Sequence, residues 1–253
     1  MTQTTKAAMA RMHFKNPPIM EAVIGIYIPE LPETVIEDFR AAASDLARLG
    51  FESQKPRTEH RFQIKVEEGV SSFEGLDSSM GFQYVRADRP SAVQFLRNGF
   101  VFSQLGRYTS WEDFTHSAKE LWQAYVKVVG PVELLSFQVR YVNKLFVPQR
   151  VPWEKYIRVY PSIPEEVPQD VLEYFLRLAM PIKYPPGRLN HLQAILPQER
   201  EGFLTMLLDN DFQFSAINVQ LSDIWSKIDE VRTVKDEYFD KFLTPLMKET
   251  FDA

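Results

Sequence analysis

Two long segments with helical spacing limit what this chain can fold into, because each follows a group of short strand-like segments. Apolar residues recur every three or four positions from Phe114 to Val129, and again from Leu221 to Phe242. A doubly wound parallel sheet instead needs helices that alternate one for one with strands. The order therefore predicts an α+β protein with antiparallel sheets, each covered by a long amphipathic helix.

Local signals place several boundaries. The β-branched run that follows Asn16-Pro17-Pro18 predicts a first strand. Ser110 is expected to cap the start of the first long helix, and Gly130 is expected to end it. Residues 67–80 are rich in glycine, serine and acidic residues, which predicts a loop or a weak edge strand there.

The order strand, helix, several strands, helix occurs twice, which predicts an internal duplication. On this interpretation, residues 1–13 form a flexible N-terminus, residues 14–130 a first α+β unit, and residues 131–253 a second unit packed closely on the first. The two halves have negligible residue-level identity, so the duplication rests on element order alone. The pattern leaves open whether the units form two sheets or one continuous sheet.

Composition and charge narrow the classes of function. The 253 residues include 29 Lys and Arg against 34 Asp and Glu, and the formal charge of -5 argues against broad non-specific binding to nucleic acid. The chain has no cysteine, which excludes disulfides, zinc–thiolate centres and cysteine nucleophiles. No apolar run approaches the roughly 20 residues of a membrane span, and the first residues lack a signal-peptide core. These features predict a cytoplasmic protein that binds no membrane.

Glu21 stands at the entrance of a very apolar strand-like segment, and Arg140 occupies a similar place among apolar residues in 139–143. A partly buried pair of these two residues would join the two units or bind a ligand. The alternative is that Glu21 is solvated or bonds to nearby backbone, as single carboxylates in strands usually do. Both interpretations make the pair worth locating in the structure.

Asp209 and Asp211 are separated by one residue, so both are expected on the same face of a strand. Two such carboxylates can hold a hard divalent cation. Solvated acids at a strand end are the simpler interpretation, because the sequence has no HExxH motif and no EF-hand loop. We therefore predict no metal and no cofactor.

Arg86, Arg97 and Arg107 are interleaved with aromatic residues in the strand-like region before the first long helix. Basic and aromatic side chains on one face of a sheet can bind single-stranded nucleic acid. The ordinary alternative is a one-sided sheet whose aromatic residues face the helices and whose arginines face water. These arginines are the candidate face for nucleic acid or a protein partner.

Four short segments resemble a sporadically distributed prokaryotic family of about this length that has no established activity. They are Phe14-x-Asn16-Pro17-Pro18-Ile19-x-Glu21, Tyr108-x-x-Trp111-x-x-Phe114, Arg140-Tyr141-Val142-Asn143 and Leu208-Asp209-Asn210-Asp211. The resemblance implies that Glu21, Arg140, Asn143 and Asp209 are the residues to test. The patchy occurrence of the family implies an accessory function in a defence or mobile-element system.

The leading interpretation is a non-enzymatic binding or interaction protein, because the sequence contains no complete catalytic motif. A protein or a second copy of the chain is the expected partner. One alternative is a metal-dependent hydrolase or nuclease that uses Asp209, Asp211 and Glu21. Another, less favoured, is binding of single-stranded nucleic acid.

Overall fold

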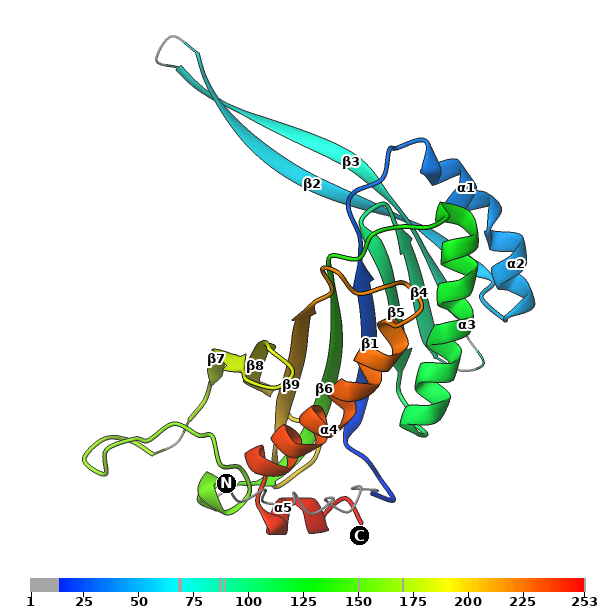
Figure 1. Ribbon diagram of the computed structural model, residues 1–253. Coiled ribbons are helices and arrows are strands. Elements are labelled where there is room, and N and C mark those ends of the chain that lie inside the picture. Colours follow the sequence, from blue (N-terminus) through cyan, green and yellow to red (C-terminus); the bar gives the residue numbers. More distant parts are fainter. Residues whose placement is uncertain are drawn as a thin grey trace, which may run out of the picture.

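The computed structural model describes residues 14–67, 70–86, 88, 90–149, 151–169 and 171–252 (Figure 1). The expected flexible N-terminus, residues 1–13, lies outside these ranges. Within them, no helix combines the length and the apolar character needed to cross a bilayer.

Nine strands in the described ranges form one antiparallel sheet with the order β2-β3-β4-β5-β1-β6-β9-β8-β7 (Figure 1). Their bounds are β1 Ile19–Tyr27, β2 Ser53–Glu67, β3 Val70–Arg86, β4 Ser91–Leu96, β5 Gly99–Leu105, β6 Ser136–Pro148, β7 Phe175–Ile182, β8 Gly187–Leu196 and β9 Phe203–Ser215.

The prediction of two sheets, each closed by its own long helix, is wrong. The first strand of each half, β1 and β6, pair with each other at the centre, with Glu21 opposite Val142 and Tyr27 opposite Ser136. Each of these strands has a second edge that pairs with β5 or β9. Pairing at both edges satisfies the backbone groups of the two central strands, so the halves merge into one sheet. The internal duplication stays a prediction from element order.

Helices cover one face of this sheet. They are α1 (Val35–Ala41), α2 (Ala43–Arg48), α3 (Trp111–Val129), α4 (Ile224–Phe242) and α5 (Pro245–Glu249), with a 3-10 turn at Trp153–Lys155. Side chains from α1, α3 and α4 share one core with alternate residues of the strands, for example Phe39, Leu121 and Ile228 with Ile24 and Phe212. A smaller apolar cluster beneath α5 continues on the same face. The long helices α3 and α4 therefore lie side by side on a single layer rather than on separate sheets (Figure 1).

The caps of α3 confirm the sequence signals. The Ser110 hydroxyl accepts a hydrogen bond from the Asp113 backbone N–H at 3.0 Å. At the other end Gly130 has φ +76°, a conformation that favours glycine. α3 therefore begins and ends at the expected residues, and this fixes the position of Trp111 in its first turn.

Of the two alternatives predicted for residues 67–80, the loop is wrong and the edge strand fits, because among the described strands β3 pairs only with β2 between Val70 and Met80. β2 and β3 pair as a long hairpin, from Ser53 opposite Val85 to Glu67 opposite Val70, and this hairpin projects beyond the rest of the sheet (Figure 1). Backbone ladders do not require apolar side chains, so a composition of glycine, serine and acids does not distinguish such a strand from a loop.

Candidate functional site

The alternation of side chains along β6 and β9 divides the predicted site residues between the two faces of the sheet. Arg140, Asp209 and Asp211 lie on the face opposite the helices, whereas Asn143 and Asn210 lie on the helix-covered face. The predicted cluster of Glu21, Arg140, Asn143, Asp209 and Asp211 is therefore split. Four of its members share the open face, and Asn143 belongs to a different environment.

On the open face, Arg140 and Asp209 form a bidentate ion pair. Nε of Arg140 donates to Oδ1 of Asp209 at 2.8 Å, and Nη2 donates to Oδ2 at 2.6 Å. The Asp209 side chain is 9% exposed and that of Arg140 is 41% exposed. The hydrogen bonds that Arg140 donates to this carboxylate raise the pKa of Arg140, with Asp211 and Glu21 contributing through their charges. Both oxygens of Asp209 are thus committed to the guanidinium.

Glu21 enters β1 on the same face, directly opposite Val142 and diagonal to Arg140. Its charge raises the pKa of Arg140, but the carboxylate that forms the ion pair with the guanidinium is that of Asp209. The predicted Glu21–Arg140 pairing is therefore replaced by an Arg140–Asp209 pair between neighbouring strands. Glu21 acts on the cluster electrostatically.

Asp211 sits opposite Arg140 in the register of β6 and β9. Its Oδ2 accepts hydrogen bonds from Gln213 Nε2 at 2.6 Å and Asn190 Nδ2 at 3.4 Å. Its Oδ1 is buried with no hydrogen-bond partner in the described part of the chain. Burial raises the pKa of the Asp211 carboxyl, and the nearby charge of Asp209 adds to that shift. This carboxylate is poorly solvated and only partly compensated.

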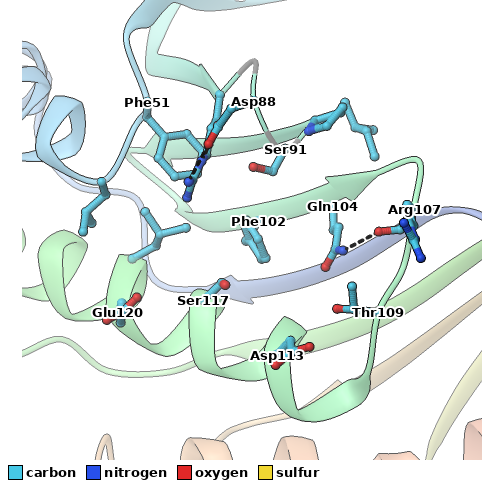
Figure 2. A pocket seen from close by; sticks show the side chains of 15 residues that line it. Phe51, Asp88, Ser91, Phe102, Gln104, Arg107, Thr109, Asp113, Ser117 and Glu120 are labelled. Carbon is cyan, nitrogen blue, oxygen red and sulfur yellow. Dashed lines mark hydrogen bonds and ion pairs between the residues drawn. The ribbon is translucent and has the colours of Figure 1, made fainter.

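The three candidate arginines do not form a shared basic face. Arg97 is held by the Leu31 carbonyl at 2.8 Å and by Glu30 at 3.0 Å. Arg86 pairs with Asp88 at 2.7 Å, while Arg86 and Arg107 line a pocket between α3 and strands β4 and β5 (Figure 2). Arg97 is thus separate in role from the other two.

The pocket in Figure 2, called the mixed-charge pocket here, has a volume of about 280 Å³. Asp113, Ser117 and Glu120 face it from one side of α3 (Figure 2). The acids on α3 and Asp88 offset the charges of Arg86 and Arg107. The lining carries three carboxylates against two guanidinium groups, so it gives a phosphate backbone no electrostatic preference.

A second pocket, called the aromatic pocket here, lies on the helix-covered face where the N-terminal segment, the start of α3 and the middle of α4 meet over β6 and β9. Its volume is about 190 Å³. Aromatic rings dominate its walls, and the polar groups come from a few positions. The lining includes Phe14, Pro17, Pro18, Ile19, Tyr108, Trp111, Glu112, Tyr141, Asn143, Asn210, Phe212, Arg232, Lys235, Asp236 and Phe239.

Each of the four segments that carry the family resemblance contributes to the aromatic pocket. The proline segment supplies Phe14 and Ile19, and the segment before α3 supplies Trp111. β6 supplies Asn143 and β9 supplies Asn210. A register shift between Ile19 and Glu21 turns Ile19 toward the pocket while Glu21 faces the other side. The four segments therefore meet in space although they are distant in the sequence.

Lys235 of α4 is a buried cation at the wall of the aromatic pocket. Its side chain is 12% exposed, and Nζ is 2.6 Å from Oδ1 of Asp236. The ammonium also lies over the Tyr141 ring at 4.6 Å and near the Trp111 ring at 5.3 Å, as cation–π contacts require. Burial lowers the pKa of Lys235, and the charge of Asp236 opposes that shift.

A chain of polar side chains leads from Tyr174, just before β7, through two buried residues of β8 to the aromatic pocket. Tyr174 donates its hydroxyl proton to Gln193 Oε1 at 3.3 Å, and Gln193 Nε2 donates to His191 Nε2 at 3.0 Å. His191 Nδ1–H then donates to Asn210 Oδ1 at 2.6 Å. Burial lowers the pKa of His191, which favours the neutral ring that this arrangement needs.

This chain orients the Asn210 side chain. Because the Asn210 carbonyl oxygen accepts from His191, the amide nitrogen is left as the group available to the pocket. Among the described residues, neither the Asn210 amide nitrogen nor the Asn143 side-chain oxygen has a hydrogen-bond partner, although both residues are almost fully buried. A donor and an acceptor therefore remain open beside the aromatic walls.

The sequence analysis missed Lys235, His191 and Asn210 as members of one site. A signal for Lys235 exists, because it occupies the apolar stripe of α4 between Val231 and Tyr238 at helical spacing. His191 similarly shares a strand face with the buried Leu189. Asn210 was noted only as the residue between the two aspartates.

Comparison with family models, with curated proteins and with solved structures gives no match. Within the described ranges, no group of three or more His, Asp or Glu side chains is placed to hold a metal ion.

Proposed function

We propose that this chain is a non-enzymatic binding protein and that the aromatic pocket holds a small planar ligand with a hydrogen-bond acceptor. The single observation that carries the proposal is the fixed direction of the Asn210 amide, whose oxygen is occupied by His191. A donor held in place before a ligand arrives costs little to organise on binding. An accessory role in a defence or mobile-element system is part of the proposal and rests on the family resemblance.

The size of the pocket supports a ligand with one ring. A cavity of about 150 Å³ in another protein holds benzene, and the aromatic pocket measures about 190 Å³. One six-membered ring with a short polar substituent fits that space. Trp111 and Tyr141 supply faces and edges against which such a ring can pack.

The charges in the pocket support binding rather than catalysis. Lys235 is paired with Asp236, and Arg232 is paired with Glu112 at 2.6 Å. The hydroxyls of Tyr108 and Tyr141 lie 3.0 Å apart and bond to each other. Each titratable group therefore already has a partner, and a nucleophile or general base would first have to lose one. The paired charges also favour a neutral ligand.

Benzamide and benzylamine provide a matched test, because they share a ring and differ in the polar group. Benzamide offers a carbonyl acceptor to the Asn210 amide, whereas benzylamine offers only a cationic donor. We expect thermal-shift and NMR titrations to detect saturable binding of benzamide and at least about tenfold weaker binding of benzylamine, which can donate to Asn143 but offers no acceptor to Asn210. Equal binding of both compounds would contradict the proposed role of Asn210.

Two variants locate the binding site. Asn210→Asp keeps an oxygen for His191 but replaces the donor that faces the pocket, so benzamide affinity should fall at least about tenfold, equivalent to about 1.4 kcal/mol. Gln104→Ala changes the mixed-charge pocket and serves as the control. Benzamide binding that survives Asn210→Asp but is lost in Gln104→Ala would place the ligand in the mixed-charge pocket and contradict the proposal.

The hydrolase alternative has a weaker basis, because the Arg140 guanidinium occupies both oxygens of Asp209. A divalent cation would have to displace it to use Asp209 and Asp211 together. We expect Mg²⁺ and Mn²⁺ to leave the melting temperature unchanged at millimolar concentration. A saturable rise that disappears in Asp211→Asn would favour the metal-dependent reading instead.

A further inference from the structure

β7 forms one outer edge of the sheet and has no neighbouring strand on its far side in the described part of the chain (Figure 1). The Tyr174 carbonyl accepts a hydrogen bond from the Ile195 N–H at 3.1 Å, so the backbone groups of even-numbered residues point toward β8. The backbone groups of Phe175, Arg177, Ala179 and Pro181 therefore point outward. Pro181, which lacks an N–H, occupies a position where that loss breaks no bond to β8.

Large apolar side chains are exposed at both ends of this edge. Leu172, just before β7, is 88% exposed, and Phe175 at its start is 68% exposed. Tyr184, just after the end of β7, is 85% exposed. A protein surface rarely leaves such residues in water along an unpaired strand, because they promote association with another strand.

We infer that a second copy of this chain pairs with β7 in antiparallel fashion, with a two-fold axis at Leu178, so that two sheets join edge to edge. Only the odd-numbered residues of β7 have backbone groups that point outward. The two-fold axis must therefore lie at a residue, so that odd-numbered residues of one copy face odd-numbered residues of the other. With the axis at Leu178, Phe175 pairs with Pro181 of the other copy and Arg177 pairs with Ala179. These pairs provide backbone hydrogen bonds at every outward position except the two proline nitrogens.

Charge and apolar complementarity select this register. Just beyond the ends of β7, it brings Glu173 near Lys183 of the other copy and Leu172 near Tyr184, which lies in the turn to β8; all four residues are exposed in one copy. An axis at Arg177 would instead set two arginines against each other, which is destabilising. An axis at Ala179 would put Phe175 opposite Lys183. The chosen register therefore pairs opposite charges and apolar surfaces in a single arrangement.

The available area is consistent with a stable dimer. An aromatic side chain buries about 150–250 Å², so Phe175 and Tyr184, at 68% and 85% exposure, offer roughly 300 Å² in each copy. Two copies thus supply roughly 600 Å² of the about 1,200 Å² at the lower end of specific interfaces. Leu172, the charged pair and the exposed residues of the outer edge add to this area.

Light scattering and analytical ultracentrifugation of the full chain test the inference. We expect a dimer at micromolar concentration, and we expect Phe175→Glu to be monomeric. Ile217→Glu is the matched control, because Ile217 is 64% exposed but lies in the connection between β9 and α4. A monomeric wild-type protein, or a dimer unaffected by Phe175→Glu, would overturn the inference.

A charge reversal tests the register itself. Glu173→Lys sets a lysine opposite Lys183 twice in each dimer, and we expect it to weaken dimerisation by at least about tenfold. The double variant Glu173→Lys/Lys183→Glu should restore the wild-type dissociation constant. The two residues stand at opposite ends of β7 within one copy, so only pairing between copies explains a rescue. Failure of the rescue would exclude this register.

Discussion

Removal of the Arg140 guanidinium is the perturbation whose consequence is best defined by the structure. Arg140→Met leaves the buried Asp209 carboxylate without its partner and beside Asp211. Breaking a fully buried pair costs about 3–5 kcal/mol, but the Arg140 side chain is 41% exposed, so part of that cost is relieved by solvent. We expect a loss of about 2–3 kcal/mol, equivalent to about 5–10 °C in melting temperature for a chain of this size.

Urea unfolding of the double-mutant cycle of Arg140→Met and Asp209→Asn measures the pair directly. The coupling energy should be about 2 kcal/mol, because the double variant leaves no unpaired buried charge. The corresponding cycle of Arg140→Met with Glu21→Gln should give a coupling energy below about 0.5 kcal/mol, since Glu21 interacts with Arg140 only by charge and forms no hydrogen bond with it. The control is Lys144→Met, also on β6, which breaks a more exposed ion pair with Glu199. Additive effects at Arg140 and Asp209 would refute the reasoning.

Three further predictions concern buried polar groups and packing. Asp211→Asn should raise the unfolding free energy at pH 7 by about 1 kcal/mol, since it removes a buried charge whose Oδ1 has no partner among the described residues. Burial raises the pKa of Asp211, so the wild-type stability contributed by its protonated form is lost as pH rises through the folded-state pKa. A urea titration from pH 4 to 7 should therefore show a smaller loss of stability in the variant. Burial lowers the pKa of His191, so wild-type stability should fall as pH drops below the unfolded pKa of about 6.5; thermal melts of His191→Gln should show a weaker dependence between pH 7 and 5, and an unchanged slope would contradict this assignment. Gly187→Ala should cost about 1–3 kcal/mol in urea unfolding, because the new methyl group would lie 2.4 Å from Cδ1 of Phe214 in the core; a neutral substitution would show that the ring moves freely.

Elements with strong local signals were predictable from the sequence. Ser110 and Gly130 mark the ends of α3 because capping depends on residues within one turn of the helix end. The joining of the two halves was not predictable in the same way. Whether β1 pairs with β6 depends on backbone groups that every strand carries, so the sequence pattern alone does not distinguish one sheet from two.

The candidate site was located in part. Arg140 is predicted as a polar residue among apolar ones, Asp209 by its spacing from Asp211, and Asn143 by the family resemblance. All three are largely or partly buried. Strand alternation then separates them, with Asn143 on the helix-covered face and the ion pair on the other. Lys235 comes from α4, which is separated from β6 by three further strands, so its contact with Tyr141 depends on tertiary packing.

The central claim is that the aromatic pocket binds a planar acceptor through the oriented amide of Asn210. The most direct measurement follows the side-chain amide resonances of Asn210 by NMR during a titration with benzamide. We predict saturable shifts of these resonances together with that of the indole N–H of Trp111, a residue of the pocket wall whose indole donates to Asp229. Unchanged Asn210 resonances, or shifts confined to Arg140 and Asp211 on the open face, would contradict the account.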